Sequence, residues 1–322
     1  MKYLVMLVTL VLAACSGGAP LAAPAAHAVL HRSLTGPQTK AKGPLLFVSD
    51  VATAEVYIYQ LSTLSVVATV TGLTQPQGEC SDKKGDVWVT DAGADAAYEL
   101  SHLGRLENTL TAPDYPVGCA WDAKTGNLAV MSLFGISGSQ GAVAIYPKGS
   151  GTAHSFQNPK QYYYNFGGYD TNGNLFFDGR AENGTFALSE LPRGAKKAVS
   201  IDVSGGTIYY PGMVQWDPAM KELVVGDQSC GGSYTASCLY AIKISGEKGS
   251  IVGKIDLQNS SGGQVCDLIQ GVIYDGRLAG SDNNICGSSP GTTYVWPFPG
   301  GGAPTESNTS TDSAPFGAAV SQ

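Results

Sequence analysis

The sequence has few charged residues, few histidines and no excess of Lys and Arg over Asp and Glu. Each of these features excludes or disfavours a class of function. Charged residues make up 14% of the 322 residues, and the formal net charge is −7. A nucleic-acid partner is excluded on this balance, because such partners are bound through clusters of Lys and Arg on phosphates. The chain also has only 4 histidines and no Cys-x-x-Cys pair, which argues against a zinc site.

One apolar run, Leu4–Leu12, lies near the N-terminus after the positive charge of Lys2, and it is too short to span a membrane. It leads into Leu-Ala-Ala-Cys at 12–15, which resembles the bacterial lipobox. The resemblance implies cleavage before Cys15 and lipid attachment there, which makes residues 1–14 a lipoprotein signal peptide. The alternative is an ordinary secretory signal with an incidental cysteine. We therefore expect an exported monomer, anchored to a bacterial membrane by lipid and facing the periplasm or the cell exterior.

Residues 15–43 hold the lipidated cysteine and a segment rich in Ala, Gly, Pro and Ser. The segment lacks the alternation of a strand, so it predicts a flexible tether. His27 and His31 lie in it, and we expect both to be solvated tether residues.

From residue 44 onward the chain repeats one phrase, seen most clearly as PQGECSDKKGDVWVTD at 76–91. The phrase predicts a strand, a tight turn and a second strand that ends in Asp. Glycine (42 residues) and proline (17) supply the turns, and 16 tyrosines suit strands. The second strand recurs six times at intervals of 41 to 55 residues: LLFVSD, DVWVTD, NLAVMS, NLFFDG, ELVVGD and RLAGSD.

These units predict an all-β fold, a six-bladed β-propeller of four-stranded blades over 44–322. Blade one lacks a first strand of its own, whereas the chain ends in APFGAAVSQ (314–322), which matches the Pro-x-Gly opening of the repeat. The ring should therefore be closed by the C-terminal strand, which would pair beside LLFVSD. With this closure the repeat resembles the NHL-repeat propellers, and the resemblance specifies architecture while leaving activity open.

The turns between first and second strands are short, so their side of the ring, which we call the turn face, should be scaffold. The opposite side, the loop face, carries the links between blades and the loops between second and third strands, the longest at 133–141, 228–238 and 283–291. Binding usually lies in such loops. Acidic residues end four of the second strands at this face: Asp50, Asp91, Asp227 and Asp282. In blade four Asp178 lies one position earlier, and in blade three Ser132 takes this place. The acids line a ligand site, or they accept hydrogen bonds from the amides of their own turns.

Tyrosines gather in the links of the loop face. They could stack on a sugar or a peptide, and packing between blades would explain them equally well. The residues are Tyr115, Tyr162, Tyr163, Tyr164, Tyr209 and Tyr210, of which Tyr115, Tyr163 and Tyr209 are our candidate ligand-binding residues.

Six cysteines remain after Cys15, an even number suited to an oxidising compartment. Cys230 and Cys238 bracket one loop and are expected to pair. Cys266 and Cys286 both belong to the loop face, and we expect them to pair as well. Cys80 and Cys119 lie on adjacent inner strands at opposite parity, so a bond across the blade interface is a third expectation, although sequence alone permits fifteen pairings.

Two functions remain open. The first is a non-catalytic binding protein that takes a small molecule, glycan or protein on its loop face and needs no cofactor. The second is a propeller enzyme resembling streptogramin lyases or lactonases, with Ca²⁺ or Mg²⁺ at the central face. A lyase would need histidine, but His102 is placed in a turn and His154 on an outer strand. The metal ligands of a lactonase-like site would be Glu79, Asn165, Asp227 and Asp282, although Glu79 near the axis could instead face only channel water.

Overall fold

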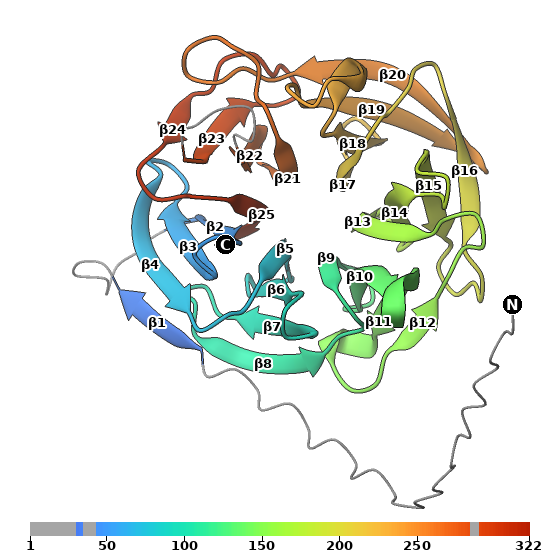
Figure 1. The fold of residues 1–322 in the computed structure, drawn as a ribbon, viewed down its shortest axis with the longest axis horizontal. Coiled ribbons are helices and arrows are strands. Elements are labelled where there is room, and N and C mark those ends of the chain that lie inside the picture. The colour runs from blue at the N-terminus through green and yellow to red at the C-terminus, as the bar shows by residue number, and fades with distance from the viewer. Residues whose placement is uncertain (1–29, 35–42, 284–289) are drawn as a thin grey trace, which may run out of the picture.

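Six four-stranded antiparallel blades stand around a common axis in the computed structural model, which describes residues 30–34, 43–283 and 290–322 (Figure 1). The signal peptide, Cys15, His27 and Cys286 lie outside these residues. Each blade runs from an inner strand at the axis to an outer strand at the rim. The fold class expected from the repeats is therefore confirmed as a β-propeller.

The first half of the ring consists of three blades, whose strands follow one another from the axis outward. Blade 1 contains β25 (Pro315–Ser321), β2 (Leu45–Asp50), β3 (Glu55–Gln60) and β4 (Ser65–Thr71). Blade 2 contains β5 (Pro76–Ser81), β6 (Val87–Asp91), β7 (Ala96–Leu100) and β8 (Leu106–Thr111). Blade 3 contains β9 (Pro116–Trp121), β10 (Leu128–Gly135), β11 (Ser139–Tyr146) and β12 (His154–Phe156).

The second half of the ring follows the same plan. Blade 4 contains β13 (Tyr163–Tyr169), β14 (Leu175–Arg180), β15 (Phe186–Leu191) and β16 (Val199–Ser204). Blade 5 contains β17 (Pro211–Asp217), β18 (Glu222–Asp227), β19 (Cys238–Ser245) and β20 (Lys248–Asp256). Blade 6 contains β21 (Leu268–Tyr274), β22 (Arg277–Asp282), β23 (Thr292–Pro297) and β24 (Glu306–Asn308). Short 3₁₀ helices occur at Ile136–Gly138, Pro147–Gly149 and Cys230–Gly232.

The Pro-x-Gly opening of the repeat lets neighbouring inner strands approach closely. A Cβ added at Gly78 would lie 2.5 Å from the carbonyl oxygen of Val117, and one at Gly317 would lie 2.4 Å from that of Gln77. Any larger residue would push adjacent blades apart. The ladder between the inner and second strands also shifts register just after the inner strand begins, in all six blades. The repeat thus encodes the tight centre of the ring.

The hydrophobic core is divided among the six interfaces between blades. Between blades 1 and 2, for example, Phe47 and Ile58 pack with Val89 and Tyr98. The other five interfaces each hold a cluster of the same kind. Since both faces of a blade are buried in this way, the second strands read as continuous apolar runs rather than alternating ones.

The C-terminal strand closes the ring as the sequence indicated. β25 pairs antiparallel with β2, with Leu45 opposite Ser321 and Asp50 opposite Pro315. In Figure 1 the red C-terminal strand lies beside the blue β2, so the two ends of the domain share one blade. Blade 1 keeps no open inner edge as a result.

One part of the expected tether is not flexible chain. His31–Leu34 forms β1, which pairs antiparallel with β4 as a fifth strand of blade 1, so His31 lies on a strand. The open outer edge of β4 accepts this strand through backbone hydrogen bonds, which require no alternation of side chains. Within the described residues no helix is long and apolar enough to cross a membrane.

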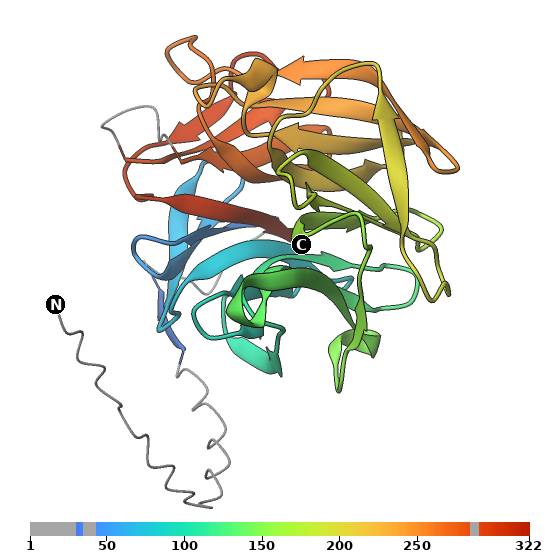
Figure 2. The same cartoon turned by 45° about the vertical axis from the view of Figure 1, so that its right-hand side comes forward.

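Blade 4 departs from the regular plan at its rim, where Figures 1 and 2 show β16 standing away from the blade. β16 pairs with β15 over three residues, and then pairs in parallel with the start of β20 in blade 5, where Asp202 lies opposite Lys248. The outer edge of β15 at Phe186 and Ala187 is left without a partner strand among the described residues. A groove of about 1280 Å³ opens there, and its lining includes Lys160, Gln161, Ala181 and Tyr209.

Candidate functional site

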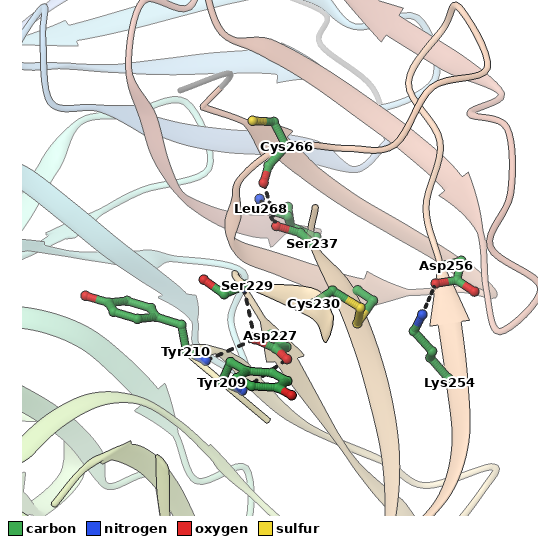
Figure 3. Close-up of a disulfide and its surroundings, with 11 residues drawn as sticks. Tyr209, Tyr210, Asp227, Ser229, Cys230, Ser237, Lys254, Asp256, Cys266 and Leu268 are labelled. Carbon is green, nitrogen blue, oxygen red and sulfur yellow. Dashed lines mark hydrogen bonds and ion pairs between the residues drawn. A yellow bond between two sulfur atoms is a disulfide. The ribbon is translucent and has the colours of Figure 1, made fainter. Parts of the chain in front are cut away.

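The acidic residues that end the second strands hold the blades together at the loop face. Figure 3 shows this for blade 5, where the Asp227 carboxylate accepts hydrogen bonds from the backbone amides of Tyr209 (3.1 Å), Tyr210 (3.0 Å) and Ser229 (2.9 Å). The first two amides belong to the link that enters the blade, and the third belongs to the blade's own loop. The carboxylate therefore clamps the link to the loop.

The other three acids are used in the same way. Asp91 accepts from the amides of Thr74, Gln75 and Gly93 at 2.8 to 3.1 Å. Asp50 accepts from Ala52 and Thr53 in its own turn and from Ser313 and Ala314 in the incoming link. Asp282 accepts from Cys266 and Asp267. Backbone amides thus occupy the oxygens that we considered for ligand binding, which favours the structural alternative; their ligand-binding role stays a prediction.

Blade 4 has no such acid, because Gly179 takes the equivalent place in the ladder, opposite Tyr164. A Cβ there would lie 1.8 Å from the carbonyl oxygen of Tyr163 and 2.8 Å from Nε2 of Gln161. Gln161 supplies the clamp instead, since its Nε2 donates to the carbonyl oxygens of Tyr163 (3.2 Å) and Asp178 (2.8 Å). Burial raises the pKa of the Asp178 carboxyl well above its usual range. The last residue of the second strand in blade 4 is therefore Arg180, which follows Gly179.

Arg180 lies between tyrosines of two different blades. Its Cζ is 4.9 Å from the ring centroid of Tyr163 on β13 and 4.8 Å from that of Tyr210 in the link to blade 5. Such contacts hold a guanidinium by cation–π attraction. No carboxylate of the described residues forms an ion pair with Arg180, and its Nε is buried without a hydrogen-bond partner there. We call this group, Arg180 with Tyr163 and Tyr210, the arginine clamp.

Aromatic residues extend from the clamp across blade 3. The Tyr162 ring meets the Tyr163 ring edge-on at 5.0 Å, and its hydroxyl donates to the carbonyl oxygen of Gly138 in the blade 3 loop at 2.7 Å. At the end of β10, Phe134 stacks on Tyr115 with ring centroids 4.7 Å apart. Aromatic contacts thus recur on the loop face from blade 3 through blade 4 to the link that enters blade 5.

Three of the five exposed large apolar side chains among the described residues lie on this part of the loop face: Ile136 (76% exposed), Tyr209 (47%) and Tyr234 (69%). The other two, Leu106 and Val252, lie on the outer strands β8 and β20. We call the aromatic surface the tyrosine arc, and it consists of Tyr115, Phe134, Ile136, Tyr162, Tyr163, Arg180, Tyr209, Tyr210 and Tyr234. Tyr164 is not part of it, because its side chain is fully buried and stacks on Phe177.

A cavity of about 220 Å³ lies on the axis and is lined by all six inner strands, with Glu79 in its wall. Oε1 of Gln270 in blade 6 accepts a hydrogen bond from the Glu79 backbone amide, and Nε2 of Gln270 donates one to the Glu79 carbonyl oxygen, both at 2.8 Å. Burial raises the pKa of the Glu79 carboxyl well above its usual range, opposed only by the Ala319 backbone. Neither Glu79 carboxyl oxygen has a well-formed hydrogen bond to the described residues.

The oxygen-bearing set proposed for a metal does not gather around this cavity. Asn165, Asp227 and Asp282 are absent from its lining, and the last two clamp links in blades 5 and 6. Among the described residues, the one group of three or more acidic, His or Cys ligand atoms within 4.8 Å of one another is Asp82, Asp86 and Glu99 on the turn face. There Asp82 Oδ1 accepts from the amides of Lys84 and Asp86, as in an ordinary turn.

His102, His154 and the four cysteines of two disulfides lie where the sequence placed them. His102, in the turn between β7 and β8, has Nδ1 2.7 Å from the Ser321 hydroxyl, and His154 begins β12. Cys80–Cys119 joins blades 2 and 3, and Cys230–Cys238 pins the blade 5 loop (Figure 3). Both disulfides confirm expected pairings. The third pairing, Cys266–Cys286, includes a residue outside the described part of the chain and stays a prediction.

The sequence matches no protein-family model and no curated protein. By structure, the chain is similar to a chain of a nidogen/laminin complex, with a TM-score of 0.65 at 11% identity over 87% of this chain and 99% of the other. It is likewise similar to a protein of unknown function from Bacteroides caccae, with a TM-score of 0.64 at 12% identity over 87% and 100%. A streptogramin B lyase reaches 0.48 at 14% identity over 82% and 73%, which is too low to carry an argument. At these identities the likenesses establish one property, that the chain has the β-propeller fold.

Proposed function

We propose that the protein is an exported, lipid-anchored β-propeller of the cell envelope that binds a small molecule, glycan or protein through the tyrosine arc, without catalysis. The observation that carries this proposal is the set of aromatic contacts over blades 3 to 5, together with the exposed side chains of Tyr209 and Tyr234 in the link and loop of blade 5. Tyrosine is well suited to binding, since it offers a large rigid apolar ring with a polar tip. The rigid blades hold these rings on loops and links.

Binding is tested by probing glycan and peptide arrays with the detergent-solubilised full chain. A Tyr209→Ala/Tyr234→Ala variant should lose the ligands that the wild type retains, while its melting temperature stays unchanged because both side chains are exposed. The matched control is Leu106→Ala/Val252→Ala, which removes two exposed apolar groups from outer strands. If the control loses the ligands and the arc variant keeps them, the ligand site lies elsewhere.

The lipid anchor is a separate part of the proposal and rests on Leu-Ala-Ala-Cys at 12–15. Replacement Cys15→Ser should abolish incorporation of labelled palmitate, because it removes the sulfur that would carry lipid. A Cys15→Ser chain that still incorporates palmitate would rule out this anchor without touching the arc.

A further inference from the structure

The arginine clamp is the charged centre of the tyrosine arc, and it has no anion. All 26 acidic residues of the chain lie within the described ranges, and none of them pairs with Arg180. Its Nε is buried and lacks a hydrogen-bond partner among the described residues. A buried donor left unpaired is costly, so native proteins rarely keep one without a reason. We propose that Arg180 binds the carboxylate of an acidic sugar, which rests on the arc being the ligand site.

The geometry of the clamp selects a planar anion. Two tyrosine rings, Tyr163 and Tyr210, lie against the guanidinium carbon at 4.9 and 4.8 Å. They fix the side chain and shield it from water, which strengthens its interaction with a charge. The N–H groups of Arg point outward in the guanidinium plane, where a carboxylate accepts two of them side by side. A neutral hydroxyl cannot make this charge-assisted pair.

The groove of blade 4 offers space for the rest of the ligand; none of the three clamp residues lines it, but chain neighbours of two of them do. The groove of blade 4 is lined by Ala181, which follows Arg180 in the chain, and by Tyr209, which precedes Tyr210. Tyr209 is 47% exposed, so its ring is available to stack on the apolar face of a sugar whose acid substituent we place on Arg180. Lys160 and Lys197 line the same groove, as do Asp202 and Glu247, so the charges of the groove balance. The positive charge offered to an anionic ligand therefore comes from Arg180 of the clamp.

The arginine side chains report on this site directly. The chain has five arginines, namely Arg32, Arg105, Arg180, Arg193 and Arg277, so each Nε–Hε resonance of the ¹⁵N-labelled full chain can be assigned by its loss in a Lys variant. Titration with glucuronate should shift the Arg180 resonance and leave that of exposed Arg193 in place. Glucose, which lacks the carboxylate, should leave the Arg180 resonance unmoved. An Arg180 resonance whose chemical shift stays unchanged on titration with glucuronate would overturn the proposal.

Two further probes separate the sources of negative charge. Inorganic phosphate tests for an oxyanion of another kind, and N-acetylalanine tests for a carboxylate without a sugar. Glucuronate should bind more tightly than either; equal or tighter binding of one of them would overturn the assignment to a sugar acid.

The variant Arg180→Lys keeps the charge but removes the planar fork, so it should weaken glucuronate binding about 10- to 100-fold. Arg193→Lys is the matched control and should have no effect. Should array ligands be lost in Tyr209→Ala/Tyr234→Ala yet bind Arg180→Lys normally, the carboxylate inference fails and the proposed function stands. Should neither variant lose them, both fail.

Discussion

Blade 2 and blade 4 occupy opposite halves of one ring and solve the same structural problem differently. Blade 2 follows the repeat: Pro-x-Gly at its inner strand, Asp91 clamping the incoming link with three amides, and four fully paired strands. Blade 4 has Gly179 in the clamp position, takes its clamp from Gln161, and shares β16 with its neighbour. The regular blade uses its polar groups to hold itself together, whereas the irregular blade leaves a cation and a groove available.

In a repeat protein, candidate functional groups are therefore found where one copy departs from the others. A carboxylate that accepts three backbone hydrogen bonds has little free capacity for a ligand, however often it recurs. Arg180 has that capacity because blade 4 breaks the pattern. Local departures from an otherwise consistent design are expected at functional sites.

The largest effect should come from opening the ring. Deletion of residues 314–322 removes β25 and its pairing with β2, together with the buried side chains of Ala318, Ala319 and Val320. Lost hydrogen bonds at about 1 kcal/mol each and lost apolar burial should approach the whole stability of a domain, about 5 to 15 kcal/mol. We expect an aggregated product in size-exclusion chromatography. Weakening the rim of blade 4 by Val203→Ala should leave a monomer, and a monomeric deletion chain with an unchanged melting temperature would disprove closure.

The disulfides should differ because one joins two blades and the other pins a loop. Cys80–Cys119 spans 39 residues and Cys230–Cys238 spans 8. Chain-entropy arguments give about 4 kcal/mol for the longer bridge and about 2.5 kcal/mol for the shorter one. Denaturant unfolding of the two double-alanine variants measures both values. A larger loss from the loop bridge would show that the blade 5 loop, and not the regular inner strands, limits stability.

The clamp of blade 2 should contribute to stability alone. Replacement Asp91→Ala leaves three amides without their acceptor and should cost about 3 kcal/mol in the free energy of unfolding. Ser132→Ala is the matched control at the equivalent ladder position in blade 3, because the Ser132 hydroxyl has no hydrogen-bond partner among the described residues. It should cost less than about 0.5 kcal/mol. Equal losses of unfolding free energy in the two variants would show that the hydrogen bonds of Asp91 do not stabilise blade 2.

The smallest effect concerns Glu79 on the axis. Burial raises its pKa above the usual 4.5, so the native state holds this proton at pH values where the unfolded chain has released it. The stability contributed by the group is therefore complete below pH 4.5 and declines as pH rises towards the native pKa. Glu79→Gln keeps the shape without the charge, so it should raise stability at pH 7 by about 1 kcal/mol.

Thermal unfolding of Glu79→Gln and wild type between pH 4 and 8 measures that gain and its dependence on pH. The gain should shrink at the acid end of the range. Exposed Glu182→Gln serves as the control and should behave as wild type. A Glu79→Gln curve parallel to wild type across the whole range would contradict the burial argument.

Much of the architecture could be predicted from the sequence because it is repeated. Six copies of one sequence repeat predict the six blades, and the additional copy of the inner-strand motif in APFGAAVSQ predicts the ring closure. The positions of Cys80 and Cys119 on adjacent inner strands predict the disulfide between blades 2 and 3. The site could be predicted only in part. Tyr163 and Tyr209 were among the candidates, but nothing in NLFFDGR marks Arg180, whose role depends on Tyr210 of the next blade. Pairing of β16 with β20, and of β1 with β4, likewise depends on open backbone edges, which side-chain patterns do not record.

We propose that the regular blades provide stability and that the tyrosine arc of blades 3 to 5 provides binding, and one paired measurement tests this division. Melting temperature and retention of array ligands are recorded side by side for Asp91→Ala and Tyr209→Ala/Tyr234→Ala. The account predicts that Asp91→Ala melts at lower temperature and still binds below that temperature, while the arc variant melts like wild type and no longer binds. The reverse pattern, with binding lost in folded Asp91→Ala and retained in the arc variant, would contradict it.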